Sequence, residues 1–162
     1  MDGKHTKVVK APIASLCFML TCLTAVISCI GGCGQESAPE QLTLYSIDGV
    51  RDPRNMPKAE EQFHGYPVLG KIEVTDAKVR QEIMAAIKDG MARSDGALPK
   101  CFWPRHAIRA FEKGKKIDYV ICFECLQLQI HANGTPQTEP TTREPQSVLN
   151  KHLKAAGIPI AP

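Results

Sequence analysis

The sequence predicts an α+β domain in which two amphipathic helices cover one face of a small antiparallel sheet of about four strands, in the order ββαββα. Short apolar runs with a two-residue period, bounded by Gly, Pro and Asp, predict the strands. Two longer segments with apolar residues three or four positions apart predict the helices. The chain of 162 residues has room for one such domain behind a leading segment.

The first two strands are predicted on either side of a polar loop. Residues 42–47 (LTLYSI) mix aliphatic and aromatic side chains and end at an Asp-Gly turn, which is typical of a strand. Residues 51–66 are rich in Pro, Gly and charge, so we expect a surface loop with one helical turn. Residues 68–75 then predict the second strand.

Two segments have the spacing of amphipathic helices. The first begins at Asp76, whose side chain can accept hydrogen bonds from first-turn amides, and runs to about Met91. The second follows a polar loop over residues 133–142 and ends before Gly157. The expected buried positions are Val79, Ile83, Ile87 and Met91 in the first helix and Val148, Leu149, Leu153 and Ala156 in the second.

Residues 101–125 form the predicted centre of the fold, a β-hairpin that carries the single Trp and the three cysteines that follow Cys33. Apolar residues alternate along its second strand up to Phe123 and resume one residue out of phase at Leu126. A β-bulge accounts for this slip because it adds one residue to a strand. Such a bulge would place Cys122 and Cys125 on one face of the sheet, away from the helices.

The position of the hairpin turn decides where Cys101 lies. With a two-residue turn at 113–114, Arg109 falls opposite Asp118 and Cys101 reaches Cys125. With a longer loop, Cys101 lies too far away. The sequence leaves both registers open.

The amino-terminal segment has the pattern of a bacterial lipoprotein signal peptide over residues 1–32. Lysines precede an apolar run over residues 11–30, and Ile-Gly-Gly-Cys at 30–33 resembles a lipobox, with Cys33 as the residue that takes the lipid, such as palmitate. Cys29 is a second candidate for the lipid site. An uncleaved transmembrane anchor is the alternative, because the apolar run is about long enough to span a bilayer.

A flexible tether over residues 33–41 and a single domain over residues 42–162 are expected to follow the leader. The acyl chains would hold the domain on a membrane of the bacterial cell envelope, facing outward from the cytoplasm. Gly34 in place of Asp gives no inner-membrane retention signal, which favours the outer membrane over the periplasmic face of the inner one. Without the leader the chain has 17 basic and 16 acidic residues, so no nucleic-acid partner is expected.

Three hypotheses account for the thiols of the hairpin. A structural disulfide, either Cys101–Cys125 or Cys122–Cys125, suits an oxidising compartment, although three cysteines leave one thiol free once Cys33 is acylated. A zinc or copper site would use Cys101, Cys122 and Cys125 with His106, but strand alternation places His106 on the opposite face. A redox pair of Cys122 and Cys125 lacks the helix amino terminus that usually stabilises such a thiolate.

The sequence shows no nucleophile, base and orienting partner together, so no catalytic residue is assigned and no cofactor is expected beyond the zinc or copper of the second hypothesis. His106 follows Pro104-Arg105, and a lone His near an apolar strand is more often packed in a core than functional. The predicted role is a lipid-anchored, extracytoplasmic and non-enzymatic module for binding or for the envelope. The alternative is a metal-binding protein that uses the cysteine hairpin.

About 95 residues, from Tyr66 to the end, resemble a group of small, uncharacterised bacterial lipoproteins. The motifs that carry the resemblance are Y-P-V-L-G at 66–70, C-F-x-P-R-H at 101–106, I-C-F-E-C at 121–125 and A-G-I-P at 156–159. The resemblance implies that the cysteine hairpin is a designed unit. It implies no activity.

Overall fold

The computed structural model describes residues 37–50, 54 and 56–161. The predicted signal peptide and the two candidate lipid sites, Cys29 and Cys33, lie outside these residues. The described strands are β1 (Gln41–Ile47), β2 (Gln62–Phe63), β3 (Tyr66–Glu73), β4 (His106–Glu112), β5 (Lys115–Cys122), β6 (Gln127–His131) and β7 (Gln137–Pro140). The helices are the short 3-10 helix η1 (Ala59–Glu61) and the α-helices α1 (Ala77–Ala92) and α2 (Pro145–Ala155).

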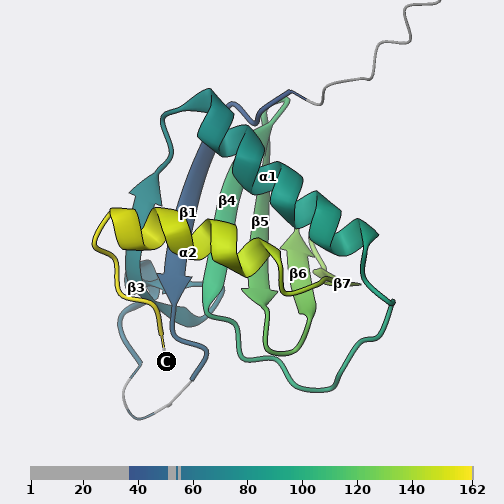
Figure 1. The fold of residues 1–162 in the computed structure, drawn as a ribbon. Coiled ribbons are helices and arrows are strands. Elements are labelled where there is room, and N and C mark those ends of the chain that lie inside the picture. The colour runs from purple at the N-terminus through teal and green to yellow at the C-terminus, as the bar shows by residue number, and fades with distance from the viewer. Residues whose placement is uncertain (1–36, 51–53, 55, 162) are drawn as a thin grey trace, which may run out of the picture. The chain divides into compact units, whose positions relative to one another are not determined.

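In the described part of the chain the strands form one antiparallel seven-stranded sheet in the order β2-β3-β1-β4-β5-β6-β7 (Figure 1). The predicted four-stranded α+β architecture in the order ββαββα is therefore wrong. The observed order is three strands, α1, four strands and α2, so the domain is mostly β-structure.

The main error concerns the phase slip after Cys122, which marks a chain reversal and not a bulge. β5 ends at Cys122, four turn residues follow, and β6 runs back antiparallel to β5 from Gln127. Leu126 in this turn has φ of 50°, a left-handed conformation that ends a strand. A reversal and a bulge both shift the alternation by one residue, so the pattern alone does not separate them.

Two further strands lie in segments that were predicted to be loops. β2 follows η1, and a tight turn at His64-Gly65, both with positive φ, joins it to β3. β7 pairs with β6 although its residues are Gln, Thr, Glu and Pro. Both strands lie at the edges of the sheet, where pairing tolerates polar residues and Pro.

Both α-helices pack on one face of the sheet (Figure 1). Asp76 caps α1 by accepting bonds from the amides of Lys78 and Val79, and Pro145 opens α2. The core beneath them contains Leu44, Ile83, Ile87, Ile108, Ile121, Leu128, Leu149 and Leu153, all fully buried. Burial of each such side chain contributes about 1.5–3 kcal/mol, which makes this face the main source of stability.

The opposite face of the sheet has its own smaller core of Tyr45, Ile47, Phe63, Tyr66, Ala107 and Val120. His64, in the turn between β2 and β3, contacts Asp118 of β5 and stacks on His131 of β6. Three strands separate β2 from β5 in the sheet order. The sheet must therefore curl toward this face, as a half-barrel, to bring these residues together.

Candidate functional site

The three thiols of the hairpin lie at one end of the sheet. Cys101 belongs to the segment 93–105 that joins α1 to β4, Cys122 is the last residue of β5, and Cys125 lies in the turn between β5 and β6. The β4–β5 turn is the two-residue one, so Arg109 pairs with Asp118. This is the register in which Cys101 was expected to reach Cys125.

Hydrogen bonds to Cys122 Sγ link the segments that carry the three cysteines, which we call the thiol cluster (Cys101, Cys122 and Cys125). The backbone N–H groups of Trp103 and Cys125 both donate to Cys122 Sγ, at 3.3 Å each. Within the described residues no two cysteines lie at the distance of a disulfide bond. All three are free thiols; Cys101 is exposed, and the other two are buried.

Backbone contacts hold the segment of Cys101 across the β5–β6 turn. The Gln127 side-chain amide donates to the carbonyl of Pro99 at 2.9 Å and to the carbonyl of Cys101. The Arg105 amide donates to the carbonyl of Ile121 at 3.3 Å. The main chain of residues 99–105 is therefore anchored to both β5 and β6, on either side of the turn.

Two of the thiols are held in their neutral form. The hydrogen bond to Cys125 raises the pKa of Cys101, and burial raises the pKa of Cys125. Because an ordinary thiol already titrates above neutral pH, both groups are mainly protonated at pH 7. Their reactivity as nucleophiles should therefore rise with pH.

His106 lies on the helix face of the sheet, away from the thiol cluster. Its Nε2 donates to Asn150 Oδ1 of α2 at 2.7 Å, and its ring meets Phe123 edge-on. Burial lowers the pKa of His106, so it stays neutral. Of the four residues in the metal hypothesis, His106 therefore lies apart from the three cysteines. Within the described ranges no group of three or more His, Cys, Asp or Glu side chains has a geometry that could hold a metal ion.

A second polar group, which we call the Asp118 cluster (His64, Arg109, Asp118 and His131), lies on the same face of the sheet as the thiols. Arg109 Nε and Nη2 donate to the two carboxylate oxygens of Asp118 at 2.8 Å, and His64 Nε2 lies 2.9 Å from Asp118 Oδ2. The rings of His64 and His131 are stacked, with centroids 3.8 Å apart. The Arg109 guanidinium also lies over the Phe63 ring.

Burial of Asp118 opposes its ionisation, but the hydrogen bonds from Arg109 and His64 outweigh burial and lower its pKa. The same hydrogen bond raises the pKa of Arg109. Burial, followed by the electrostatic effect of the neighbouring His64, lowers the pKa of His131. The cluster thus fastens the β2–β3 turn to the middle of the sheet by charge-assisted hydrogen bonds.

Sequence reasoning found only one contact of the Asp118 cluster, the pairing of Arg109 with Asp118. His64 and Asp118 are 54 residues apart, and no motif spacing links them. Only one indication of this cluster is present in the sequence, namely the positions of Asp118 and His64. Asp118 interrupts an apolar strand opposite an Arg, and His-Gly at 64–65 fits a tight turn.

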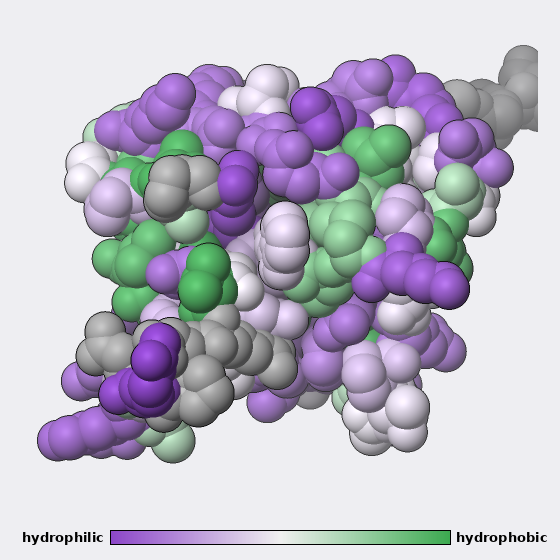
Figure 2. Space-filling model, turned by 90° about the horizontal axis from the view of Figure 1, so that it is seen from below, coloured by the Kyte–Doolittle hydropathy of each residue, from purple (hydrophilic) through white to green (hydrophobic). Residues whose placement is uncertain are grey.

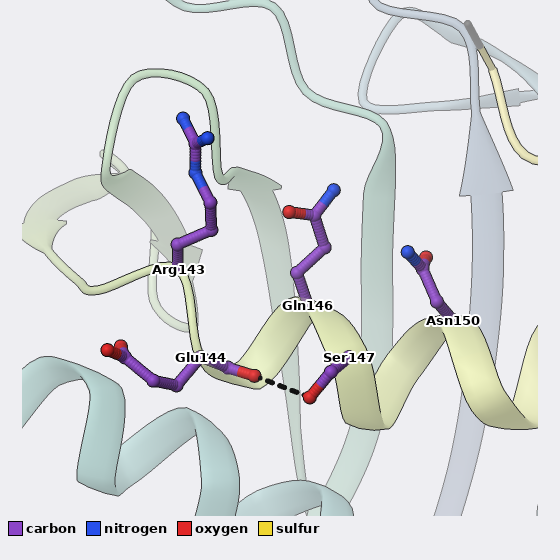
Figure 3. Close-up of a pocket in the computed structure, with 5 residues that line it drawn as sticks. All are labelled: Arg143, Glu144, Gln146, Ser147 and Asn150. Carbon is purple, nitrogen blue, oxygen red and sulfur yellow. Dashed lines mark hydrogen bonds between the residues drawn. The ribbon is translucent and has the colours of Figure 1, made fainter.

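An open depression lies beside the start of α2 (Figure 3). Its lining is polar: Arg143, Glu144, Gln146, Ser147 and Asn150. The Ser147 hydroxyl donates to the Glu144 carbonyl at 2.9 Å, as a first-turn helix contact, and the Asn150 oxygen is engaged by His106. These bonds serve the helix and its packing on the sheet, and they do not activate a nucleophile.

Comparisons with protein-family models, with curated proteins and with solved structures gave no match. Among the described residues, no helix is both long enough and apolar enough for a membrane span.

Proposed function

We propose that the chain is a lipid-anchored, extracytoplasmic domain that binds a protein partner through one end of its sheet. We call this the loop end; it consists of residues 48–50, 93–105 and 123–126. The observation that carries the proposal is Trp103, a residue that is 67% exposed while its backbone is held by a hydrogen bond.

The proposed location at a membrane surface is inferred from the leader and from the length of the tether. The Ile-Gly-Gly-Cys pattern at 30–33 supports lipidation of Cys33, and β1 begins at Gln41. Residues 34–40 lie between these points, and an extended chain of this length spans at most about 25 Å. A lipid on Cys33 would thus keep the domain close to the membrane surface.

The backbone of Trp103 is held from two sides. Its N–H donates to Cys122 Sγ, and Gly49 packs so closely that an added Cβ would lie 2.9 Å from the Trp103 carbonyl carbon. Pro104, the next residue, is buried. An exposed aromatic side chain on a fixed backbone loses little conformational entropy when a partner covers it, and Trp is enriched at binding hot spots.

Other exposed apolar side chains lie on the same loops, namely Val50 (68% exposed), Leu98 (51%) and Leu126 (38%). Figure 2 views the molecule from this end and shows hydrophobic side chains among polar ones. Beside them, Glu124 forms ion pairs with Arg105 and Arg143, at 3.5 and 3.4 Å. A projecting aromatic with a charged surround fits a protein surface better than a small ligand, which requires a concave pocket.

The binding role is tested with a photo-crosslinking amino acid placed at position 103 of the full chain in its own cells. Position 69 is the matched control, because Leu69 is an exposed apolar residue (40%) on β3. We expect a protein adduct from position 103 only. Trp103→Ala should weaken binding of that partner by about tenfold or more, whereas Leu69→Ala should leave it unchanged. Equal adducts from both positions would contradict the binding role.

The address is tested separately by labelling with radioactive palmitate and by intact mass. The mature protein should begin at an acylated Cys33, and Cys33→Ser should abolish the label. A full-length, unlabelled protein inside the cytoplasm would contradict the proposed membrane location. The test of partner binding does not depend on this result.

A further inference from the structure

The β2–β3 hairpin has little backbone pairing to hold it in place. β2 has only two residues, and its register with β3 contains two residue pairs. A tight turn at His64-Gly65 joins the two strands. We call residues 62–66 the flap. Because an isolated two-stranded hairpin is at best marginally stable, the side-chain contacts of the flap with the middle of the sheet decide whether it stays closed.

Two side chains of the flap reach the middle of the sheet. The centroid of the Phe63 ring lies 4.6 Å from that of the Tyr45 ring of β1, and both residues are buried. His64 Nε2 lies 2.9 Å from Asp118 Oδ2, and the His64 ring stacks on the His131 ring with 3.8 Å between centroids. The closed flap thus covers apolar surface, and His64 fastens it to β5 and β6.

The surroundings of the two imidazoles favour at most one added proton. In the part of the chain that the structure describes, Asp118 is the carboxylate that lies against them, and Arg109 already donates to both of its oxygens. The strand register places further titratable side chains on this face of the sheet: Lys71, Glu73, Lys116 and Tyr45. β1 and β4 separate Glu73 from β5, and burial raises the pKa of the Tyr45 hydroxyl, which therefore stays neutral. A second proton thus adds a positive charge without a carboxylate beside it.

Stacking couples the protonation of one histidine to that of the other. At a centroid distance of 3.8 Å two imidazolium charges repel one another, whereas a charged ring and a neutral ring can remain stacked. The contact of His64 with Asp118 can accommodate one proton. Among the described residues His131 Nε2 is buried without a hydrogen-bond partner, so a proton on this nitrogen has no acceptor. Burial, and then His64, lowers the pKa of His131, which agrees with this arrangement.

We propose that the flap is a pH-dependent cover, which stays closed while His64 and His131 share at most one proton and opens when both rings are protonated. Repulsion then separates the stacked pair, and opening exposes Phe63 and Tyr45. The open form binds one proton more than the closed form, so acid favours it. The flap packs on the smaller core, opposite the helices, so α1 and α2 can stay packed while it opens. The device depends neither on the lipid anchor nor on Trp103.

The test measures amide hydrogen exchange of the full-length protein by mass spectrometry between about pH 7.5 and 5, with times scaled for the pH dependence of intrinsic exchange. We expect the protection of residues 62–66 to fall by about tenfold per pH unit in the range where the second proton binds, because opening takes up one proton. Amides of α1 report global unfolding, and the flap should lose protection in excess of theirs.

Two variants separate the stacked pair from other histidines. His131→Phe keeps an aromatic ring against His64 but cannot take a proton, so its flap should stay closed in acid. His152→Gln is the control, because His152 lies on α2 and contacts Glu82, and its flap should open as in the wild type. Circular dichroism checks the fold of both variants. In the wild type, the ring resonances of His131 should titrate by NMR over the pH range in which the flap opens.

Four results would overturn the proposal. The first is flap protection that does not change with pH. The second is an equal loss of protection in the flap and in α1, because this would be global unfolding. The third is a His131→Phe flap that opens in acid as the wild type does. The fourth, which needs no variant, is titration of the His131 ring outside the range in which the flap opens.

Discussion

Arg109 and Asp118 form a two-pronged ion pair across β4 and β5, with both N···O distances 2.8 Å. Asp118 is almost fully buried at 1% exposure, whereas the Arg109 side chain is 34% exposed. The carboxylate is thus the desolvated partner, and the hydrogen bonds from Arg109 and His64 stabilise its ionised form.

We expect Asp118→Asn to lower the free energy of unfolding by about 3 kcal/mol at pH 7, because it leaves the donors of the pair without a charged acceptor. Urea denaturation measures the change. Glu82→Gln is the control; Glu82 pairs with Lys151 at 3.0 Å on the surface, and an exposed pair contributes less than about 1 kcal/mol. Equal losses for both variants would contradict the assigned role of Asp118.

The same pair predicts a pH dependence. The pKa of Asp118 is lower in the folded protein than the value of about 3.9 in an unfolded chain. Its contribution is therefore present above the unfolded pKa and is lost as pH falls through the folded pKa. The difference between wild type and Asp118→Asn should shrink when denaturation is repeated near pH 3, and an unchanged difference would contradict this assignment.

We expect His106 to make the stability of the protein depend on pH in a second, higher range. Burial lowers its pKa, and among the described residues its Nδ1 has no hydrogen-bond partner, so a proton there would be a buried, unpaired charge. Below about pH 6.5 the unfolded chain binds this proton and the folded one does not. Stability should fall by up to about 1.4 kcal/mol from His106 between pH 7.5 and 5.5.

Denaturation of His106→Gln at both pH values checks this effect. The variant should lose that share of the pH dependence. His131 acts in the same direction, so some dependence remains. His152→Gln is the control, and it should retain the full His106 share. A variant with the same pH slope as wild type would show that His106 is not the group that titrates.

At Gly90 we expect the usual stabilisation of a helix by Ala relative to Gly to be reversed. Ala normally stabilises a helix interior by about 1 kcal/mol relative to Gly. A Cβ at Gly90 of α1 would lie 2.6 Å from Cγ of Pro145, the first residue of α2, and 2.7 Å from Oγ1 of Thr141, which precedes α2; both residues are buried. Overpacking costs about 1–3 kcal/mol, so Gly90→Ala should destabilise the protein.

Thermal unfolding measures the Gly90 effect, with the exposed Ala85 of the same helix as control. Ala85→Gly should destabilise by about 1 kcal/mol through propensity alone. A higher melting temperature for Gly90→Ala would mean that α1 and α2 do not approach as closely as described.

Part of the site could be predicted from the sequence, because it depends on residues that are close to one another along the chain. Alternation along β4 and β5 placed Cys122 opposite the helix face and His106 on that face, and it left two possible registers for Cys101. The turn at Lys113-Gly114, both with positive φ, decides between them in the structure. The β2–β3 turn, and with it His64, carries no local sign of its contact with Asp118.

The sequence by itself determined which short segments bury one face. The two helices, β1 and β3 lie within about two residues of the ranges that periodicity predicts, because side-chain burial repeats at the period of each element. Only the tertiary structure decided that the chain reverses at Cys122, that a polar segment becomes β7, and that the sheet curls until His64 meets Asp118. These features depend on hydrogen bonds and contacts between distant residues, and a residue's neighbours in the sequence do not encode them.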